Sequence, residues 1–343
     1  MLLSTQLQYG DDPINNAEAV VGLEKAGLDV VWVAEAYSYD AVSLMGYLAA
    51  RTERVQIGSG ILPIYSRTPT LTAMTAAGLD ALSGGRMILG LGASGPQVIE
   101  GFHGVVYDKP IARTREIIDI CRKVWRREKL TNEGLYPIPL PEGQGTGLGK
   151  PLKLINHPQR ADIPIWVAAL GDKNVELTAE LAQGWLPHVL MPEKLRDVFG
   201  DAMDRGFAKR SPELGQLQIT GGGILAIEED MFGPARQLTR GMNALYIGGM
   251  GARGKNFYNT VFQRQGYADE AAVVQDLYLD GKKDEAAAAL PEEFIAQTSL
   301  IGPPSFVKER IAALREAGVT HLHVNPISSD PQKVLSQVKE WLQ

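Results

Sequence analysis

The sequence predicts an α/β domain folded as a (β/α)8 TIM barrel, and three observations lead to this prediction. Short segments that are wholly apolar alternate with segments of helical periodicity along most of the chain. Continuous apolar strands between helices are typical of parallel sheets that are covered on both faces. About eight such units fit within the 343 residues, and barrels of this kind often form one domain of that length.

The first four strand–helix units are expected in the N-terminal part of the chain. Glycines at 27 and 84–85 follow helical segments, at positions where a helix stop is expected. One helix is expected to begin near Asp11 and another at Asp40, where an acidic side chain can cap the first turn. The expected strands of this part are residues 2–7, 30–33, 55–58 and 86–90.

Two segments of the second half break this rhythm. Residues 129–162 are rich in proline and glycine without a sustained period, so we expect a surface excursion. Residues 228–300 are largely helical in pattern with a turn at 248–251, and we expect an insertion above the barrel. Residues 1–343 are therefore predicted to be one domain with two insertions. The remaining expected strands are 163–169, 185–188, 217–227 and 320–325, with helices at 113–128, from 172 toward 184, at 303–317 and from 330.

Composition and charge exclude several classes of protein. The net charge is −6 and no run of lysine or arginine stands out, so a nucleic-acid surface is not expected. The only cysteine, Cys121, lies on the apolar face of an expected helix, which predicts a buried thiol and fits a reducing compartment. No signal peptide and no apolar run of membrane-spanning length is apparent. We expect a soluble, cytoplasmic protein.

The stretch from Val55 to Pro69 changes character within a few residues. It begins as a buried strand and passes into Gly58-Ser-Gly60, then into apolar residues, Tyr65 and Arg67. The glycines allow a flat ligand to approach the backbone, or allow a strained backbone conformation. The strand end is therefore interpreted as a surface for something flat, and the alternative is a glycine bulge that leads into a proline turn.

In a TIM barrel the active site lies at the carboxyl ends of the strands. The expected ends here are heavy in glycine and light in acid–base pairs, which suggests that a bound cofactor supplies the chemistry. No histidine spacing suits a metal. The stretch from Gly90 to Gly95 matches the dinucleotide fingerprint only formally, because Pro96 follows at once. The expected ends are Gln8/Tyr9, Glu35–Asp40, Gly60–Arg67, Gly92–Gly95, Ala169–Asp172, His188 and Asn325.

Two of these ends are loops that could present backbone N–H groups to a phosphate. They are Leu91–Gly95 and Ala169–Asp172, and the second leads directly into an expected helix start. The alternative is that both are tight strand-to-helix turns without a ligand. The residues alone leave both interpretations open.

Several stretches together resemble the bacterial luciferase-like flavin and deazaflavin family, in particular its coenzyme F420-dependent oxidoreductase branch. They are residues 58–69, 89–96 and 165–171, joined by 34–41 and 300–304. The resemblance implies that the isoalloxazine-like ring lies at the barrel mouth. It also implies a bulge with a non-prolyl cis peptide, Gly60–Ile61, at the end of the third strand.

The resemblance also implies which residues hold the cofactor and leaves the catalytic residues unknown. The sugar-phosphate dehydrogenase branch has a histidine and a glutamate where this sequence has Ala36 and Ala93, so that substrate is not expected. The catalytic candidates are Glu35, Asp40 and Tyr37, although Glu35 and Asp40 could instead bond a neighbouring loop or cap a helix. The substrate-binding candidates are Tyr65, Arg67 and His188. The implied cofactor-binding residues are Glu35, Gly60, Ile61, Leu62, Leu91, Gly92, Ala93, Ser94, Ala168, Ala169, Leu170, Gly171 and Asp172.

The leading hypothesis is an F420-dependent oxidoreductase that transfers a hydride between C5 of the deazaflavin and an unidentified small organic substrate. One alternative is an FMN-dependent luciferase-like monooxygenase. An alternative of another class is a non-catalytic protein that binds F420 or flavin. Members of the family are commonly dimers, so a homodimer is expected, with no nucleic-acid or membrane partner and no metal.

Overall fold

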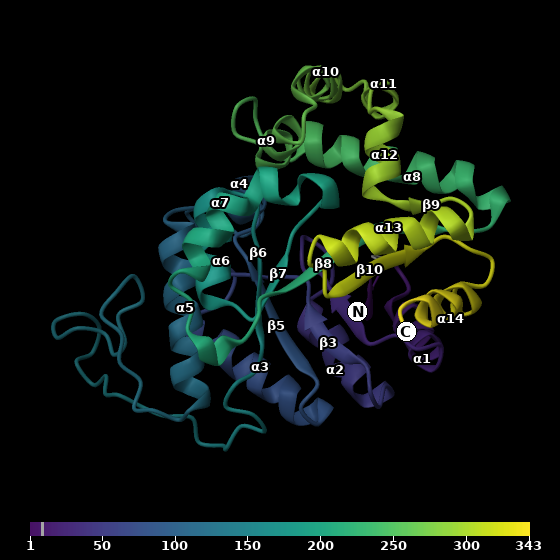
Figure 1. Cartoon of the computed structure of the whole chain (residues 1–343). Helices are drawn as coiled ribbons and strands as arrows, with labels where there is room; N and C mark the ends of the chain where they lie inside the picture. The colour runs from purple at the N-terminus through teal and green to yellow at the C-terminus, as the bar shows by residue number, and fades with distance from the viewer. Residues whose placement is uncertain (8–9) are drawn as a thin grey trace.

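Eight parallel strands close into a barrel in the computed structural model, which describes residues 1–7 and 10–343 (Figure 1). The predicted TIM barrel is therefore confirmed, and each expected strand has its counterpart. The strand end expected at Gln8 and Tyr9 lies outside the described residues. The barrel strands are β1 (Leu2–Gln6), β2 (Val30–Val33), β3 (Gln56–Ser59), β5 (Met87–Gly92), β6 (Ile165–Ala168), β7 (Gly184–Leu186), β8 (Gln218–Ala226) and β10 (His321–Pro326).

The last strand closes the barrel. In β10, His321 lies opposite Leu2 of β1 on one side and opposite Thr220 of β8 on the other. All of these pairings are parallel, as expected for strands that are connected by helices. Two short strands extend the sheet at its carboxyl edge: β4 (Leu62–Pro63) pairs with β5, and β9 (Leu300–Ile301) pairs with β8.

Helices surround the barrel, and four of them have a side-chain cap at the first turn, including the one that the sequence predicts at Asp40. The side chains of Asp12, Asp40, Thr68 and Asp330 each accept a hydrogen bond from a backbone N–H of the helix that follows. A short helix, α4 (Pro96–Ile99), follows β5. The surrounding helices are α1 (Pro13–Lys25), α2 (Ala41–Arg51), α3 (Pro69–Ser83), α5 (Pro110–Trp125), α6 (Asp172–Leu181), α7 (Leu195–Phe207), α13 (Pro304–Glu316) and α14 (Pro331–Trp341).

Two tryptophans fill the inside of the barrel. The ring centroids of Trp32 and Trp166 lie 5.1 Å apart. Each ring occupies the space beside a glycine: a Cβ at Gly58 would lie 2.3 Å from the ring of Trp32, and one at Gly184 would lie 2.0 Å from that of Trp166. Glycine at these two positions is therefore what allows the large rings to fit inside the barrel.

The segment 228–300 forms a helical layer at the top of the molecule (Figure 1). Its buried side chains include Ile247, Phe262 and Phe294, which belong to a second hydrophobic cluster. The turn expected at 248–251 is corrected, because Leu245–Gly249 is a five-residue π-helical turn. Gly248 and Gly249 pack on Tyr278: a Cβ at Gly248 would lie 2.4 Å from the Cβ of Tyr278, and one at Gly249 would lie 2.5 Å from its ring. The helices are α8 (Phe232–Ala244), α9 (Phe257–Arg264), α10 (Ala268–Leu279), α11 (Lys283–Ala288) and α12 (Glu292–Thr298).

The segment 129–162 has no helix and projects from the body of the molecule (Figure 1). Its base is held by Glu116, whose carboxylate accepts backbone N–H groups from Leu135 and Tyr136. At its other end, the guanidinium of Arg160 donates to the buried Asp80 of α3 at 2.5 Å. Among the described residues, no helix combines the length and the apolar character needed to cross a membrane.

Cys121 is buried, as its place on the apolar face of a helix predicts. Its side chain is 0% exposed on α5, and burial raises the pKa of the thiol to about 12. A thiol in that state is not a nucleophile at neutral pH. Cys121 is a packing residue, as its place on the apolar helix face predicts.

Candidate active site

The segments expected to hold a cofactor lie next to one another along one arc of the barrel mouth. Strand pairing sets this neighbourhood, since Leu62 lies opposite Leu91, Leu89 opposite Ile165, and Trp166 opposite Gly184. The carboxyl ends of β3, β5 and β6 are therefore adjacent. This arc contains the expected residues Gly60, Ile61, Leu62, Leu91, Gly92, Ala93, Ser94, Ala168, Ala169, Leu170, Gly171 and Asp172.

The end of β3 carries a bulge. Gly58 pairs with Ile88 and Leu62 pairs with Leu91, so four residue steps on one strand stand against three on the other. One extra residue therefore lies between β3 and β4, which is the definition of a β-bulge. The peptide bond between Gly60 and Ile61, where the family resemblance places a cis peptide, is cis.

The neighbouring strand is shaped to fit this bulge. The hydroxyl of Ser59 donates to the carbonyl of Gly90 and accepts its N–H, both at 2.8 Å. A Cβ at Gly90 would lie 1.8 Å from the carbonyl oxygen of Ser59, and one at Gly92 would lie 2.8 Å from the Ile61 side chain. Glycines 90 and 92 are thus needed for packing against the bulge, a structural reason for the motif that formally resembles a dinucleotide fingerprint.

The third segment of the arc is the start of α6. Its N-cap residue, Gly171, makes no side-chain cap, so the first backbone N–H groups of the helix lack that partner. A helix start of this kind is suited to an anion. Asn174, one turn in, has a buried side-chain oxygen without a hydrogen-bond partner among the described residues. Sequence reasoning missed Asn174, and Phe257 too, whose ring would lie 3.3 Å from a Cβ at Gly171.

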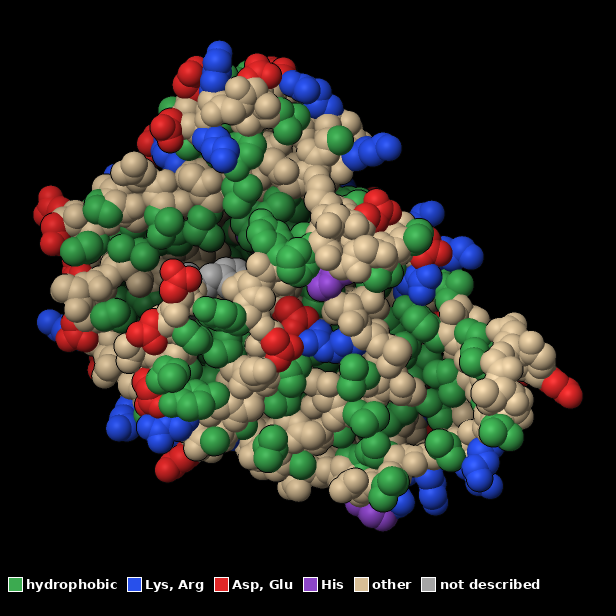
Figure 2. Space-filling model, turned by 180° about the vertical axis from the view of Figure 1, so that it is seen from behind, with side chains coloured by type: hydrophobic (Ala, Val, Ile, Leu, Met, Phe, Trp, Pro, Cys, Tyr) green, Lys and Arg blue, Asp and Glu red, His purple; other side chains and the backbone are tan. Residues whose placement is uncertain are grey.

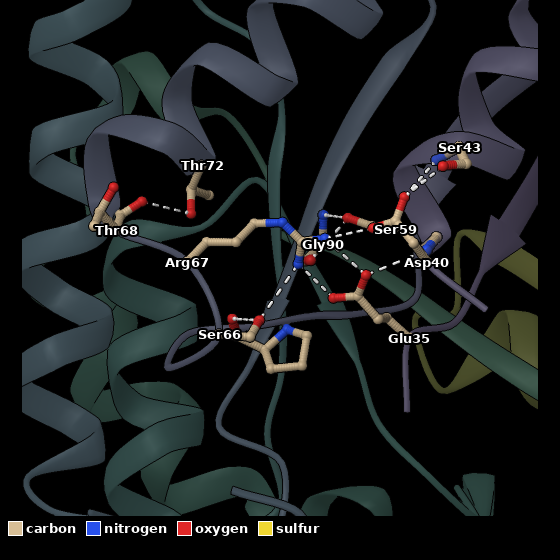
Figure 3. A network of polar contacts seen from close by, with 11 residues as sticks. Glu35, Asp40, Ser43, Ser59, Ser66, Arg67, Thr68, Thr72 and Gly90 are labelled. Carbon is tan, nitrogen blue, oxygen red and sulfur yellow. Dashed lines mark hydrogen bonds and ion pairs between the residues drawn. The ribbon is translucent and has the colours of Figure 1, made fainter. Parts of the chain in front are cut away.

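Glu35, Asp40 and Arg67 form one polar network at the mouth (Figure 3). The Arg67 guanidinium donates to both carboxylate oxygens of Glu35 and to Asp40 at 2.9 Å. Glu35 also accepts the N–H of Ala41 at 3.2 Å, and its side chain is only 10% exposed. Glu35 therefore bonds a neighbouring loop and Asp40 caps a helix, which are the structural alternatives that the sequence left open.

Asp40 caps α2 through the backbone N–H and the hydroxyl of Ser43, both at 2.8 Å. Partial burial acts to raise the pKa of the Asp40 carboxyl, but these two bonds and the positive charge of Arg67 together hold it below its ordinary value. Asp40 is therefore a charged capping group near neutral pH.

The substrate-binding candidates lie in different surroundings. The hydroxyl of Tyr65 donates to the carbonyl of Asp108 at 2.8 Å, and the residue is 9% exposed, so its polar group is already engaged. Arg67 is engaged by the two carboxylates described above. His188 differs, because its Nε2 atom is buried and has no hydrogen-bond partner among the described residues.

Five aromatic side chains form what we call the aromatic wall: Tyr37, Phe102, His188, Tyr246 and Tyr258. The ring of His188 lies 3.9 Å from that of Tyr246 and 5.2 Å from that of Tyr258, measured between centroids. Tyr37 and Phe102 form a separate pair of rings with centroids 6.2 Å apart. Burial raises the pKa of Tyr246 and Tyr37 raises it further through its charge, which places this pair in the same region of the mouth. On the rear face, hydrophobic side chains border a hollow below the helices at the top of the molecule (Figure 2). Sequence reasoning missed Phe102, Tyr246 and Tyr258, whose positions follow no motif.

His188, which belongs to this wall, and the nearby His323 are neutral. Burial lowers the pKa of His188 to about 4, assisted by the nearby His323, and burial alone lowers that of His323 to about 4. A neutral imidazole carries one N–H and one acceptor nitrogen. Among the described residues, no group of three or more histidine, cysteine or acidic side chains could hold a metal ion.

Comparisons with known proteins agree with this geometry. The family model described as luciferase-like monooxygenase matches residues 2–321. A Mycobacterium tuberculosis protein, named provisionally as coenzyme F420-dependent oxidoreductase Rv3520c, is 42% identical over 344 residues, with 98% of each chain covered. The 5,10-methylenetetrahydromethanopterin reductase of Archaeoglobus fulgidus is 28% identical, with 92% of this chain and 90% of the other covered.

Solved structures show the same fold. The coenzyme F420-dependent tetrahydromethanopterin reductase of Methanopyrus kandleri superposes with a TM-score of 0.81 at 23% identity, covering 99% of this chain and 97% of the other. An F420-dependent secondary alcohol dehydrogenase superposes with a TM-score of 0.74 at 18% identity, covering 99% and 98%. At these identities the likeness speaks for the fold alone.

Proposed function

Because this chain belongs to the luciferase-like monooxygenase family, we propose that it is a coenzyme F420-dependent oxidoreductase acting on a small organic molecule. The relative that is 42% identical over nearly the whole chain carries the name of this coenzyme, and so do two structures of the same fold. When bound, the deazaflavin supplies or accepts a hydride at C5. The protein then has to position the ring and its partner, which is how such enzymes contribute to the reaction.

The observation that carries the proposal is the arc formed by β3, β5 and β6. The bulge at Gly60–Leu62 offers backbone and apolar side chains to a flat ring. The glycines at 90 and 92 bring β5 close against that bulge, and the loop to Ser94 follows. The start of α6 lacks a side-chain cap, which supports a role for Ala168–Asp172 in binding the anionic part of the coenzyme.

Among the catalytic candidates, Tyr37 has the most accessible polar group. Its side chain is 65% exposed and belongs to the aromatic wall. Glu35 and Asp40 are committed to Arg67 and to the start of α2, so we assign them to holding the loop after β2. The less exposed rings of the wall, His188, Tyr246 and Tyr258, would help to exclude water from the space above the coenzyme ring, which suits transfer of a hydride.

We propose further that two copies associate through the outer face of α3. Leu71, Met74 and Leu82 are 46%, 53% and 72% exposed on this face. Gly78 lies among them, and a Cβ there would meet nothing within 4 Å. A helix face without charges and with this much exposed apolar area is typical of a protein interface.

Two further proposals concern location and domain organisation. The free, buried Cys121 supports a cytoplasmic location. Contacts such as the ion pair between Arg160 and Asp80 support one domain over residues 1–343.

The proposal is tested by titrating the purified protein with oxidised coenzyme F420 and, in parallel, with FMN, following the quenching of ligand fluorescence. Tight binding of F420 and weak binding of FMN would support it, and reduction of the bound coenzyme by candidate substrates would then be measured. Preference for FMN would move the protein to the flavin-dependent monooxygenases, where oxygen uptake is the next assay. If neither molecule bound, the cofactor assignment would be wrong.

A further inference from the structure

The aromatic wall favours substrates of a particular shape and polarity. Its rings come from three separate parts of the chain: the loop after β2, the residues after α4, and the segment from 188 to 258. The centroids of contacting rings lie 3.9 to 6.2 Å apart, and the faces and edges of these rings make up most of the surface of the wall. Such a surface favours a flat, apolar molecule.

One polar atom stands in this apolar surface. Nε2 of His188 is buried and has no hydrogen-bond partner among the described residues, although a buried nitrogen of this kind is normally bonded. The imidazole packs against both Tyr246 and Tyr258, whose rings also contact each other at 4.9 Å, so this packing restricts how the imidazole can turn. An atom in this position is a ready partner for one oxygen of a ligand.

Two arginines at the barrel mouth are already paired with acids, which argues against an anionic ligand. The guanidinium of Arg67 is already bound by Glu35 and Asp40, and Arg264 is bound by Asp172 at 2.7 Å. His188 is neutral because it is buried. A phosphate or carboxylate placed against the wall would lose water without gaining a cation from these groups, which is unfavourable.

The position of Tyr246 is set by its backbone. It lies in the π-helical turn Leu245–Gly249, and turns of this type often occur at functional sites. The side-chain amide of Asn256 donates to the carbonyls of Tyr246 and Ile247 at 2.9 and 3.0 Å. The ring that contacts His188 is therefore held in place before any ligand binds.

We propose that the aromatic wall selects a neutral, flat, apolar substrate that places one carbonyl or hydroxyl oxygen on Nε2 of His188. This inference rests on the proposed function. In the reducing direction, the carbonyl carbon would accept a hydride supplied by the reduced coenzyme, which is thereby oxidised by two electrons, and the π electron pair of the C=O bond would move to oxygen. That oxygen takes a proton from water while His188 holds it by a hydrogen bond, and the product is the alcohol.

The test compares two ketones that differ by one charge, acetophenone and 4-acetylbenzoate. Binding to the coenzyme-free protein is measured by saturation-transfer NMR, and kcat/KM is measured with reduced F420. We expect acetophenone to show saturation transfer and 4-acetylbenzoate little, with kcat/KM lower for 4-acetylbenzoate by at least about 100-fold, because its carboxylate would be buried without a partner. Equal or stronger binding of 4-acetylbenzoate would overturn the inference.

Variants of His188 and Tyr246 test where the substrate binds. His188→Leu removes the polar atom and is expected to lower kcat/KM for acetophenone by about 10- to 100-fold, and His188→Gln is expected to restore part of it. Tyr246→Leu removes a ring and should raise KM more than it lowers kcat. His157→Leu, on the projecting segment, is the matched control with unchanged kinetics, and circular dichroism verifies folding.

Two further results separate this inference from the proposed function. If F420 failed to bind, the proposed function would fail, while the NMR contrast between the two ketones would still decide the inference. If F420 bound and neither His188→Leu nor Tyr246→Leu changed the saturation transfer or the kinetics, the inference would be wrong and the proposed function would stand.

Discussion

Arg67 binds both carboxylate oxygens of Glu35, and this pair joins the loop after β2 to the loop after β4 (Figure 3). The two side chains are 13% and 10% exposed. An ion pair that is this well buried is difficult to break one partner at a time, because the remaining charge is left without water or a counter-ion.

Replacing Arg67 by methionine is therefore expected to lower the free energy of unfolding by about 3–5 kcal/mol. Urea unfolding followed by tryptophan fluorescence measures it. Arg253→Met is the matched control, because its ion pair with Asp276 is 59% and 62% exposed and should contribute less than about 1 kcal/mol. Equal effects of the two changes would contradict the structural role of Arg67.

Asp40 gives a test of capping against catalysis. Asp40→Ala should lower the free energy of unfolding by about 1 kcal/mol, because the cap of α2 is lost. Asp40→Asn keeps an acceptor for the N–H of Ser43 and should be close to wild type in stability. We expect turnover within about threefold of wild type for Asp40→Asn. A stable Asp40→Asn protein without turnover would show instead that Asp40 takes part in proton transfer.

The glycines that face the two tryptophans are expected to tolerate no side chain. Gly58→Ala and Gly184→Ala each place a Cβ 2.3 and 2.0 Å from a ring. We expect losses of about 1–3 kcal/mol or failure to fold, as for other overpacked cores. Gly241→Ala is the control, since a Cβ there meets nothing within 4 Å and helix propensity should add about 0.5–1 kcal/mol. Thermal unfolding separates the two groups.

Stability should fall in mild acid because of three histidines. Burial lowers the pKa values of His188, His321 and His323 to about 4, from 6.5. Between these values the unfolded chain binds more protons than the native one, so stability is complete above pH 6.5 and is lost as the pH falls toward 4. Each group contributes up to about 1.4 kcal/mol per pH unit. Urea midpoints that did not change between pH 7 and pH 5 would contradict this.

The face of α3 predicts how the protein associates. Met74→Glu puts a charge among exposed apolar side chains and should weaken the proposed dimer by more than about 100-fold, because the carboxylate would be buried in the interface without a partner. Sedimentation velocity measures the change. Leu148→Glu on the projecting segment, at a residue that is 83% exposed, is the control and should leave the dimer intact. A wild-type protein that is monomeric at all concentrations would remove the dimer proposal.

The strands were predictable because parallel strands that are covered on both faces have continuous apolar sequences, such as Val30–Val33. Contacts between distant loops were not. Glu35 and Arg67 are 32 residues apart, and no spacing rule relates the ends of two different strands. Tyr246 appeared only as part of a helical insertion, and the glycines after it appeared as a turn, because their contact with Tyr278 is tertiary.

The pairing of β10 with both β1 and β8 has a consequence for synthesis on the ribosome. A nascent chain that ends before His321 leaves two strands with unpaired edges, one at each side of an open sheet. Such edges can pair with other chains. The emerging polypeptide therefore stays exposed to edge pairing until its last strand has left the exit tunnel, and chaperone binding at those two edges would be useful until then.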